Sequence, residues 1–318
     1  MSGVAYVVAA TGDVRSIARE DAPTAQGALV WTHLALGESE VRAWLTDRAG
    51  LPPFVVDALT ATETRPRCDA ADGGAVINLR GLASASDDAS DSLASIRMFV
   101  AAGRVWSVSR QPLDVMERVC DAVRAGRILD PGDLVTEIAL AITEELDPMV
   151  ADLGDELDDC EESLDSHRAF ALRRTVNRVR VAAIGYRRFV LPQRQALEKL
   201  ANLPAAWLSA DDRLHLAGAA DRAARMAEEL EAIRERAALV HETLTDLRAE
   251  TLDQRSLVIA IVAMVFLPLT FLTGLLGMNV EGIPYAREPW AFWGVVGVCA
   301  GMALAIAGYF IRRHWFRG

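Results

Sequence analysis

Three consecutive residues, Gly277, Met278 and Asn279, follow directly on a long uncharged segment, and their types suggest ion chemistry. A glycine there can end a helix in a left-handed turn. Asn279 then offers an amide carbonyl, whose neutral oxygen can hydrogen-bond the water shell of a divalent cation that dehydrates reluctantly. Such weak binding also lets the ion leave. We therefore predict an ion-capture and selectivity element here, to which Glu281 would add negative charge.

One face of the preceding apolar segment is smaller and more polar than the rest. Its residues Ser256, Ala263 and Thr270, continued by Gly277, recur at intervals of seven, which is close to two helical turns. Such a face can line a water-filled path, but small residues also favour close helix packing, so both interpretations stay open. The predicted lining positions are Ser256, Ile259, Ala263, Leu267, Thr270 and Gly274.

Carboxylates continue this face toward the N-terminus. They are Asp253, Asp246, Glu242 and Glu235. Rings of carboxylates would concentrate cations at an inner mouth. An ordinary solvent-exposed helix face would explain the same residues equally well.

Two segments are long and apolar enough to cross a membrane. Residues 257–276 contain no charged side chain and number 20, the length that a helix needs to cross about 30 Å of hydrocarbon. Residues 290–311 repeat the pattern, with Trp290 and Trp293 at one end and Tyr309 near the other, as expected at headgroup level. We predict two transmembrane helices rather than two core helices of a soluble protein.

The flanking basic residues predict the orientation of both helices. Arginines precede the first span and follow the second, whereas the loop 277–289 holds one arginine against two glutamates. The positive-inside rule therefore places both termini, including the tail 312–318, in the cytoplasm, and the loop outside. No signal peptide is expected. The predicted location is the inner (plasma) membrane, with the lipid bilayer as one partner.

Two helices cannot enclose a path by themselves, because backbone polar groups in a bilayer must be satisfied and a single hairpin has no lumen. A conduit would therefore be an oligomer of identical chains. Closed cyclic symmetry would repeat each lining residue as a ring.

Composition narrows the function further. The chain holds 33 basic and 44 acidic side chains, and the part after residue 255 contributes only four and two of them. The remainder is strongly acidic, which argues against nucleic acid as a partner and favours cations. The four cysteines are scattered, as in a reduced compartment. No Gly-rich phosphate loop, nucleophile elbow or zinc-protease motif appears, so we expect neither an enzyme nor a bound cofactor.

Strand and helix signals alternate through residues 1–130, which predicts a cytoplasmic α/β domain with a mixed sheet and an α/β/α arrangement. The strand signals cover 3–10, 27–36, 73–82, 93–102 and 104–110, and the last two form a hairpin. Helical patterns cover 38–50, 52–61 and 112–126.

After residue 130 only helical signals remain. Residues 131–205 predict a helix hairpin, and its arms carry opposite charge: 144–165 holds eleven acids and no base, whereas 168–199 holds nine bases and one acid. The arms can attract each other, or both can simply be solvated. A third helix, capped at Ser209, would run unbroken through 209–276 into the membrane. Its heptad seam needs the hairpin or other copies as a cover. The seam consists of Met226, Leu230, Ile233, Ala237, Val240, Leu244, Leu247 and Thr251.

At these residues the chain resembles a known family. The stretch "MVFLPLTFLTGLLGMNVEGIPY" resembles the end of the first span in the CorA superfamily, which is marked by G-M-N. The continuation "VEGIP" lacks the M-P-E of magnesium-transporting members and is similar to the zinc transporter branch. "WTHL", "ALTATETRPR", "FVLPQR" and "DDRL" also resemble that branch, so the likeness covers the whole chain.

The resemblance implies a homopentameric funnel whose first span lines a pore. It also implies divalent cations as cargo, chiefly Zn²⁺, with Mg²⁺, Co²⁺, Ni²⁺ and Cd²⁺ as others. Gly277, Met278 and Asn279 carry over as the selectivity element, and Thr270 as a pore-lining ring. Glu281 departs from the branch, where glycine is more usual, so ion preference does not transfer simply.

The residue types by themselves do not indicate Zn²⁺ as the transported ion. Zn²⁺ prefers cysteine and histidine ligands, and no such residue falls on the predicted lining face, so no inner-sphere metal site is predicted. A Mg²⁺ or Co²⁺ channel therefore remains an alternative. A membrane-anchored ligand-binding or signalling domain is the third possibility.

Overall fold

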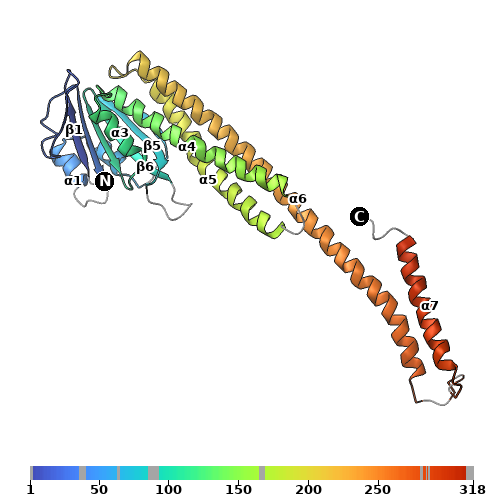
Figure 1. Cartoon of the computed structure of the whole chain (residues 1–318). Coiled ribbons are helices and arrows are strands. Elements are labelled where there is room, and N and C mark those ends of the chain that lie inside the picture. Colours follow the sequence, from blue (N-terminus) through green and yellow to red (C-terminus); the bar gives the residue numbers. More distant parts are fainter. Residues whose placement is uncertain are drawn as a thin grey trace. The chain divides into compact units, whose positions relative to one another are not determined.

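The computed structural model describes residues 3–35, 41–62, 65–84, 93–164, 169–279, 282, 283, 285 and 287–312. The chain forms two compact units (Figure 1). The first contains Met1–Leu164 and Phe170–Glu242, and the second contains Asp165–Ala169 and Thr243–Gly318.

A seven-stranded mixed sheet forms the centre of the first unit, which confirms the predicted fold class. Its order is β2-β1-β3-β7-β6-β5-β4. All neighbours are antiparallel except β3 and β7, which run parallel. The strands are β1 (Val4–Val8), β2 (Val14–Ser16), β3 (Leu29–Ala35), β4 (Arg67–Ala71), β5 (Gly74–Leu82), β6 (Leu93–Ala101) and β7 (Arg104–Ser109). Sequence reasoning missed β2 and β4, because these edge strands are short and largely polar.

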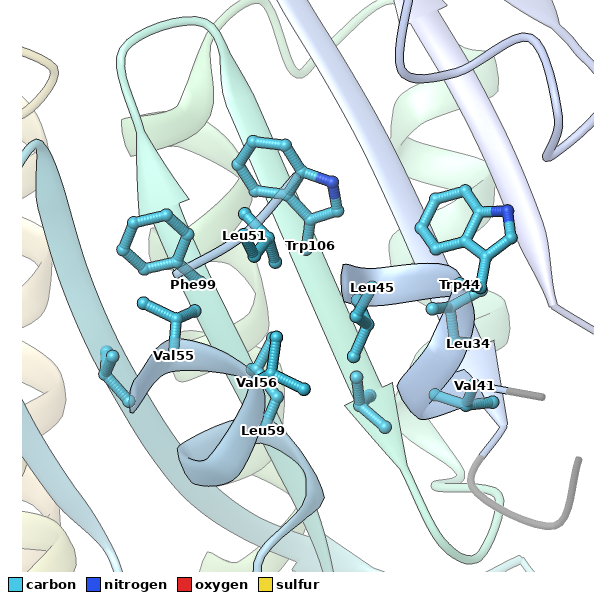
Figure 2. Close-up of a cluster of buried hydrophobic side chains, with 12 residues drawn as sticks. Leu34, Val41, Trp44, Leu45, Leu51, Val55, Val56, Leu59, Phe99 and Trp106 are labelled. Atoms are coloured by element: carbon cyan, nitrogen blue, oxygen red, sulfur yellow. The ribbon is translucent and has the colours of Figure 1, made fainter. Parts of the chain in front are cut away.

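Helices cover both faces of this sheet. On one face α1 (Val41–Ala43), η1 (Trp44–Arg48) and α2 (Pro53–Thr60) pack an apolar cluster against β3, β6 and β7. Figure 2 shows Leu45, Val56 and Leu59 pointing from these helices toward the strands. On the other face lie α3 (Val115–Arg124) and α4 (Pro131–Glu162). A Cβ added at Gly81 of β5 would lie only 3.0 Å from Ile142 of α4, so this glycine permits the close approach.

A chain of polar contacts runs through the sheet centre. Trp31 Nε1 donates to Ser107 Oγ at 2.9 Å, and the same oxygen lies 2.9 Å from His33 Nδ1. His33 Nε2 in turn lies 3.3 Å from Ser109 Oγ. If Ser107 donates to Nδ1 and Nε2–H donates to Ser109, a neutral imidazole satisfies all three contacts. Burial lowers the pKa of His33 to about 4, so the ring is neutral at physiological pH.

The helix hairpin consists of α4 and α5 (Ala169–Ala201), and α6 (Ala210–Leu276) follows. Ser209 caps α6 as predicted, because its Oγ accepts from the N–H of Asp212 at 3.0 Å. Much of the predicted seam of α6 is buried in the first unit, including Leu230, Ile233 and Ala237. Arg236 of α6 binds Asp158 and Glu161 of α4, and Arg187 of α5 binds Glu231 of α6 at 2.9 Å. The hairpin therefore covers the seam within one chain.

The second unit contains the C-terminal part of α6 and α7 (Ala291–Arg312). Both helices are long and apolar enough to cross a membrane, and the apolar windows are unburied. This agrees with the two spans predicted at 257–276 and 290–311. The first transmembrane segment is continuous with α6, as the unbroken helical pattern predicted.

Candidate ion pathway

The membrane segment of α6 has two different faces within the second unit. Its partly buried residues recur on one face, namely Leu257, Ile261, Val265, Pro268, Leu269, Leu272 and Leu276. The opposite face is exposed and carries all six predicted lining residues: Ser256, Ile259, Ala263, Leu267, Thr270 and Gly274. Leu267 and Ile259, for example, are 75% and 70% exposed. The predicted lining face is therefore the one that the rest of this unit leaves open.

The partly buried face is turned toward α7. One groove of about 520 Å³ is lined by Leu269 and Thr273 of α6 and by residues of α7 that include Val296 and Cys299. Another, of about 340 Å³, is lined by Leu272 and Leu276 together with residues of α7. Two threonines three residues apart on α6 thus differ in surroundings. Thr270 lies on the open face, whereas Thr273 lies beside α7 and donates to the carbonyl oxygen of Leu269 at 2.9 Å.

Sequence reasoning assigned no role to Pro268, which lies inside α6. Proline has no N–H, so the carbonyl of Met264 lacks its usual partner four residues on. Pro268, Leu267, Thr270 and Phe271 surround a shallow hollow. A proline within an uncharged helix is a signal that could have identified this position.

The G-M-N triplet lies where the helix ends. The last helical residue is Leu276, and the N–H of Gly277 still donates to the carbonyl of Thr273 at 2.9 Å. Met278 and Asn279 are exposed beyond it. The prediction that Gly277 adopts a left-handed turn is wrong, because the positive φ angles of this region belong to Gly282 (107°) and Tyr285 (61°). A Cβ at Gly277 would come within 3.0 Å of the Thr273 carbonyl, so tight closure of the last turn accounts for the glycine.

The loop after the triplet is described only in part. Glu281 lies outside the described residues, so its predicted role stays a prediction. Glu288 is exposed, and its N–H donates to the carbonyl of Tyr285 at 3.0 Å. The rings of Tyr285 and Trp290 contact each other with centroids 5.2 Å apart. This contact holds the end of the loop at the start of α7.

The predicted inner-mouth acids are all exposed. Asp246 and Asp253 lie in the second unit on the side of α6 that carries Ser256, and Glu242 is the last residue of the first unit. Glu235, farther along, lies 3.7 Å from Arg234. Within the second unit, helical spacing places Asp246 and Asp253 on one side of α6.

A separate cluster of three aspartates, which sequence reasoning missed, lies where α4 and α6 begin. Carboxylate oxygens of Asp130, Asp133 and Asp212 lie within 4.8 Å of one another. Asp130 accepts from the N–H of Asp133, and Asp133 from that of Leu129. Asp212 accepts from the N–H and the hydroxyl of Ser209, both at 2.8 Å. These bonds satisfy the helix termini, which explains the cluster without a metal ion.

Comparison with known proteins places this geometry in a family. The model of the family described as "CorA-like Mg2+ transporter protein" matches residues 26–313 of this chain. The divalent cation transporter CmaX of Pseudomonas aeruginosa is 32% identical over 289 residues, which cover 90% of this chain and 87% of CmaX. The zinc transport protein ZntB of Cronobacter sakazakii is 31% identical over 313 residues, covering 96% and 92% of the two chains.

Solved structures agree with the sequence comparison. The structure of full-length CmaX aligns with a TM-score of 0.79 and 30% identity, covering 98% of both chains. The CorA magnesium transporter of Methanocaldococcus jannaschii aligns with a TM-score of 0.82 at 15% identity, covering 99% of both, which shows a shared fold. With two apolar helices, an exposed face on the first of them and a G-M-N triplet at its end, the chain belongs to the family of CorA-like Mg²⁺ transporter proteins.

Proposed function

We propose that this protein moves hydrated divalent cations across the inner membrane through a pore formed by five copies of the chain. One observation carries this proposal. The face of α6 that bears Ser256, Ala263 and Thr270 is turned away from α7 and leads to Asn279. A ring of such faces would surround a path, and α7 would stay on the lipid side.

In this pore Asn279 captures the ion at the outer mouth. Five amide oxygens bind the waters of the hydrated ion, and Thr270 supplies a second polar ring farther in. No charged residue lies between Ser256 and Asn279, so the ion passes without a strong inner-sphere site. Fast passage needs this weakness, because a tightly held ion would not leave.

Charge selection comes from both mouths. Glu281 and Glu288 supply carboxylates to the outer loop, and Asp246, Asp253 and Glu242 supply them at the inner end. With both termini in the cytoplasm, the acidic inner rings would accumulate divalent ions there. Such accumulation is a reasonable basis for control of the pore by intracellular cations.

Zn²⁺ is the proposed cargo, and Mg²⁺ or Co²⁺ the alternative. Several relatives at 27–31% identity are named zinc transport proteins, and "VEGIP" follows the triplet as in that branch. CmaX, at 32% identity, is named only as a divalent cation transporter. Glu281, if it replaces a smaller neutral residue of the branch, would raise the local cation concentration at the entrance.

Metal uptake into liposomes that contain the purified protein tests the proposal. We expect Zn²⁺ entry, measured with an encapsulated fluorescent chelator, that falls at least tenfold in Asn279→Ala. The matched control is Asn202→Ala, since Asn202 is an exposed residue at the end of α5. Mg²⁺ entry without Zn²⁺ entry would support the alternative cargo. Absence of flux for every divalent metal, in liposomes shown to contain assembled protein, would refute transport. Repeating the assay with a pH gradient shows whether protons drive it.

A further inference from the structure

The opposite charges of the hairpin arms mostly do not meet. Within the described residues, one ion pair joins α4 and α5, between Glu156 and Arg178. Asp158 and Glu161 of α4 instead form ion pairs with Arg236 of α6. Of the two interpretations that the sequence left open, solvated arms describe most of these charges, and mutual attraction describes the Arg178–Glu156 pair. The unpaired groups lie on the outer sides of the two helices.

We call the first of these outer surfaces the α4 outer stripe. It consists of Asp152, Asp155, Asp159 and Glu162, which are exposed and form no ion pair within the described part of the chain. The spacing of three, four and three residues keeps all four on one side of the helix. Leu153, Leu157 and Cys160, on the opposite side, are buried.

The second surface, the α5 outer stripe, is basic and apolar. It consists of Phe170, Arg174, Asn177, Val181, Ile184 and Arg188, all exposed. Val181 and Ile184 are 61% and 48% exposed, and Phe170 is 79% exposed. Steps of four and three residues are the spacing of a helix-contact seam, which ordinarily faces another helix. Val176, Val179 and Ala183 on the other side of α5 are buried within the chain, so this seam is a second one and has no helix against it among the described residues.

The two stripes also match in height. Rotation about a closed symmetry axis parallel to the hairpin changes no residue's height along that axis. The Arg178–Glu156 pair shows which residues of the antiparallel arms are level. Counting from it, Arg174 comes within one residue, about 1.5 Å, of Asp159, and Val181 within one residue of Asp152. Ile184 similarly comes close to the exposed Ala151. A neighbouring copy thus presents Asp159 at the height where α5 presents Arg174.

We propose that the α5 outer stripe binds the α4 outer stripe of a second copy of this chain, and that this head-to-tail contact joins the cytoplasmic units into a ring. The inference rests on the proposed oligomeric function and deepens it by assigning an interface. An anionic lipid surface would fit the α5 outer stripe alone. It would leave unexplained why four unpaired acids lie at the matching height on α4.

Two measurements on the full-length protein in detergent and in nanodiscs test the contact. Arg174→Glu and Asp159→Arg should each lower the association constant at least tenfold, because like charges then face each other, and the double variant should recover most of it. Mass photometry measures the assembled fraction, and circular dichroism checks that the fold is kept. Glu198→Arg, an exposed acid that pairs within its own helix, is the control.

Cysteine cross-linking locates the contact directly. Val181→Cys combined with Asp152→Cys should give a ladder of linked chains under mild oxidation, at least fivefold above either single variant. Linkage in the double variant carrying Asn279→Ala, with metal flux lost, would uphold the interface and show that only conduction had failed. The protein could conduct metal but give no ladder, with an association constant unchanged by either charge reversal. That result would refute the proposed interface and leave the proposed pore standing. Loss of linkage only when anionic vesicles are added would identify lipid as the occupant of α5 and equally overturn the proposal.

Discussion

Gln193 of α5 accepts a hydrogen bond from the backbone N–H of Arg80 in β5, with 2.7 Å between its Oε1 and the nitrogen. Arg80 lies beyond the part of β5 that pairs with β4. The amide oxygen of Gln193 therefore accepts the hydrogen bond that a neighbouring strand would otherwise accept. The guanidinium of Arg80 stacks over the ring of Phe189, 3.9 Å from its centroid. The motif "FVLPQR" thus fastens the helix hairpin to the sheet.

Removing this amide should destabilise the protein. Gln193 is 2% exposed, and Gln193→Leu would remove the side-chain oxygen that accepts from the N–H of the half-buried Arg80. We expect the free energy of unfolding to fall by about 1–3 kcal/mol, as measured by urea denaturation followed by tryptophan fluorescence. Gln195→Leu, two residues along and exposed, is the control and should change little. Equal losses in both variants would contradict the role of this hydrogen bond.

His33 should make stability depend on pH. Burial holds its pKa near 4, whereas an unfolded histidine titrates near 6.5. The unfolded state therefore binds an extra proton between these values, and stability is lost as pH falls from about 6.5 to 4. The linkage is on the order of 2–3 kcal/mol across that window.

The comparison of wild type with His33→Gln isolates this effect from the carboxylates. Melting temperatures measured from pH 7 to pH 4 should fall more steeply for wild type than for the variant. His215→Gln, at an exposed position of α6, should keep the wild-type slope. Parallel curves for wild type and His33→Gln would show that the buried ring does not couple to pH.

The two neighbouring threonines of α6 offer a test of which face conducts. Thr270→Val removes a hydroxyl from the open face, and we expect it to lower Zn²⁺ flux several-fold because the ion loses a polar ring. Thr273→Val removes a hydroxyl that already donates within its own helix beside α7, so flux should stay near wild type. The liposome assay measures both. A larger loss in the second variant would mean that the other face lines the path.

The acidic cluster at the helix starts should be less stable when ionised. Burial, and after it the nearby carboxylates of Asp130 and Asp212, raise the pKa of Asp133. The folded state then binds a proton more readily than the unfolded state, so the penalty applies above the raised pKa and disappears in acid. Asp133→Asn keeps an acceptor for the N–H of Leu129 while removing the charge. We expect a higher melting temperature at pH 7 and no gain near pH 4. A variant that is less stable at pH 7 would show that the carboxylate is worth more as a helix cap.

Local patterns were enough to predict most elements of this protein, although the short edge strands β2 and β4 were missed. Apolar stretches of 20 residues identified the spans, and the alternating signals before residue 130 identified a mixed sheet, because both depend on residues close in sequence. The stripe from Ser256 to Gly274 was likewise visible, since helical periodicity alone defines a face. Ser209 was recognisable as a cap for the same reason.

Tertiary structure decided what each face meets. Periodicity could not say that α7 covers Leu269 and Leu272 and leaves Thr270 open, nor that Arg178 of α5 would pair with Glu156 of α4. The sequence also could not predict the backbone conformation of Gly277 or the hydrogen bond between Gln193 and the N–H of Arg80. The sequence by itself determined which segments are helices, strands and membrane spans. Only the packing of segments distant in the chain determined which side chains are buried, which are paired, and which remain available to an ion or a second copy.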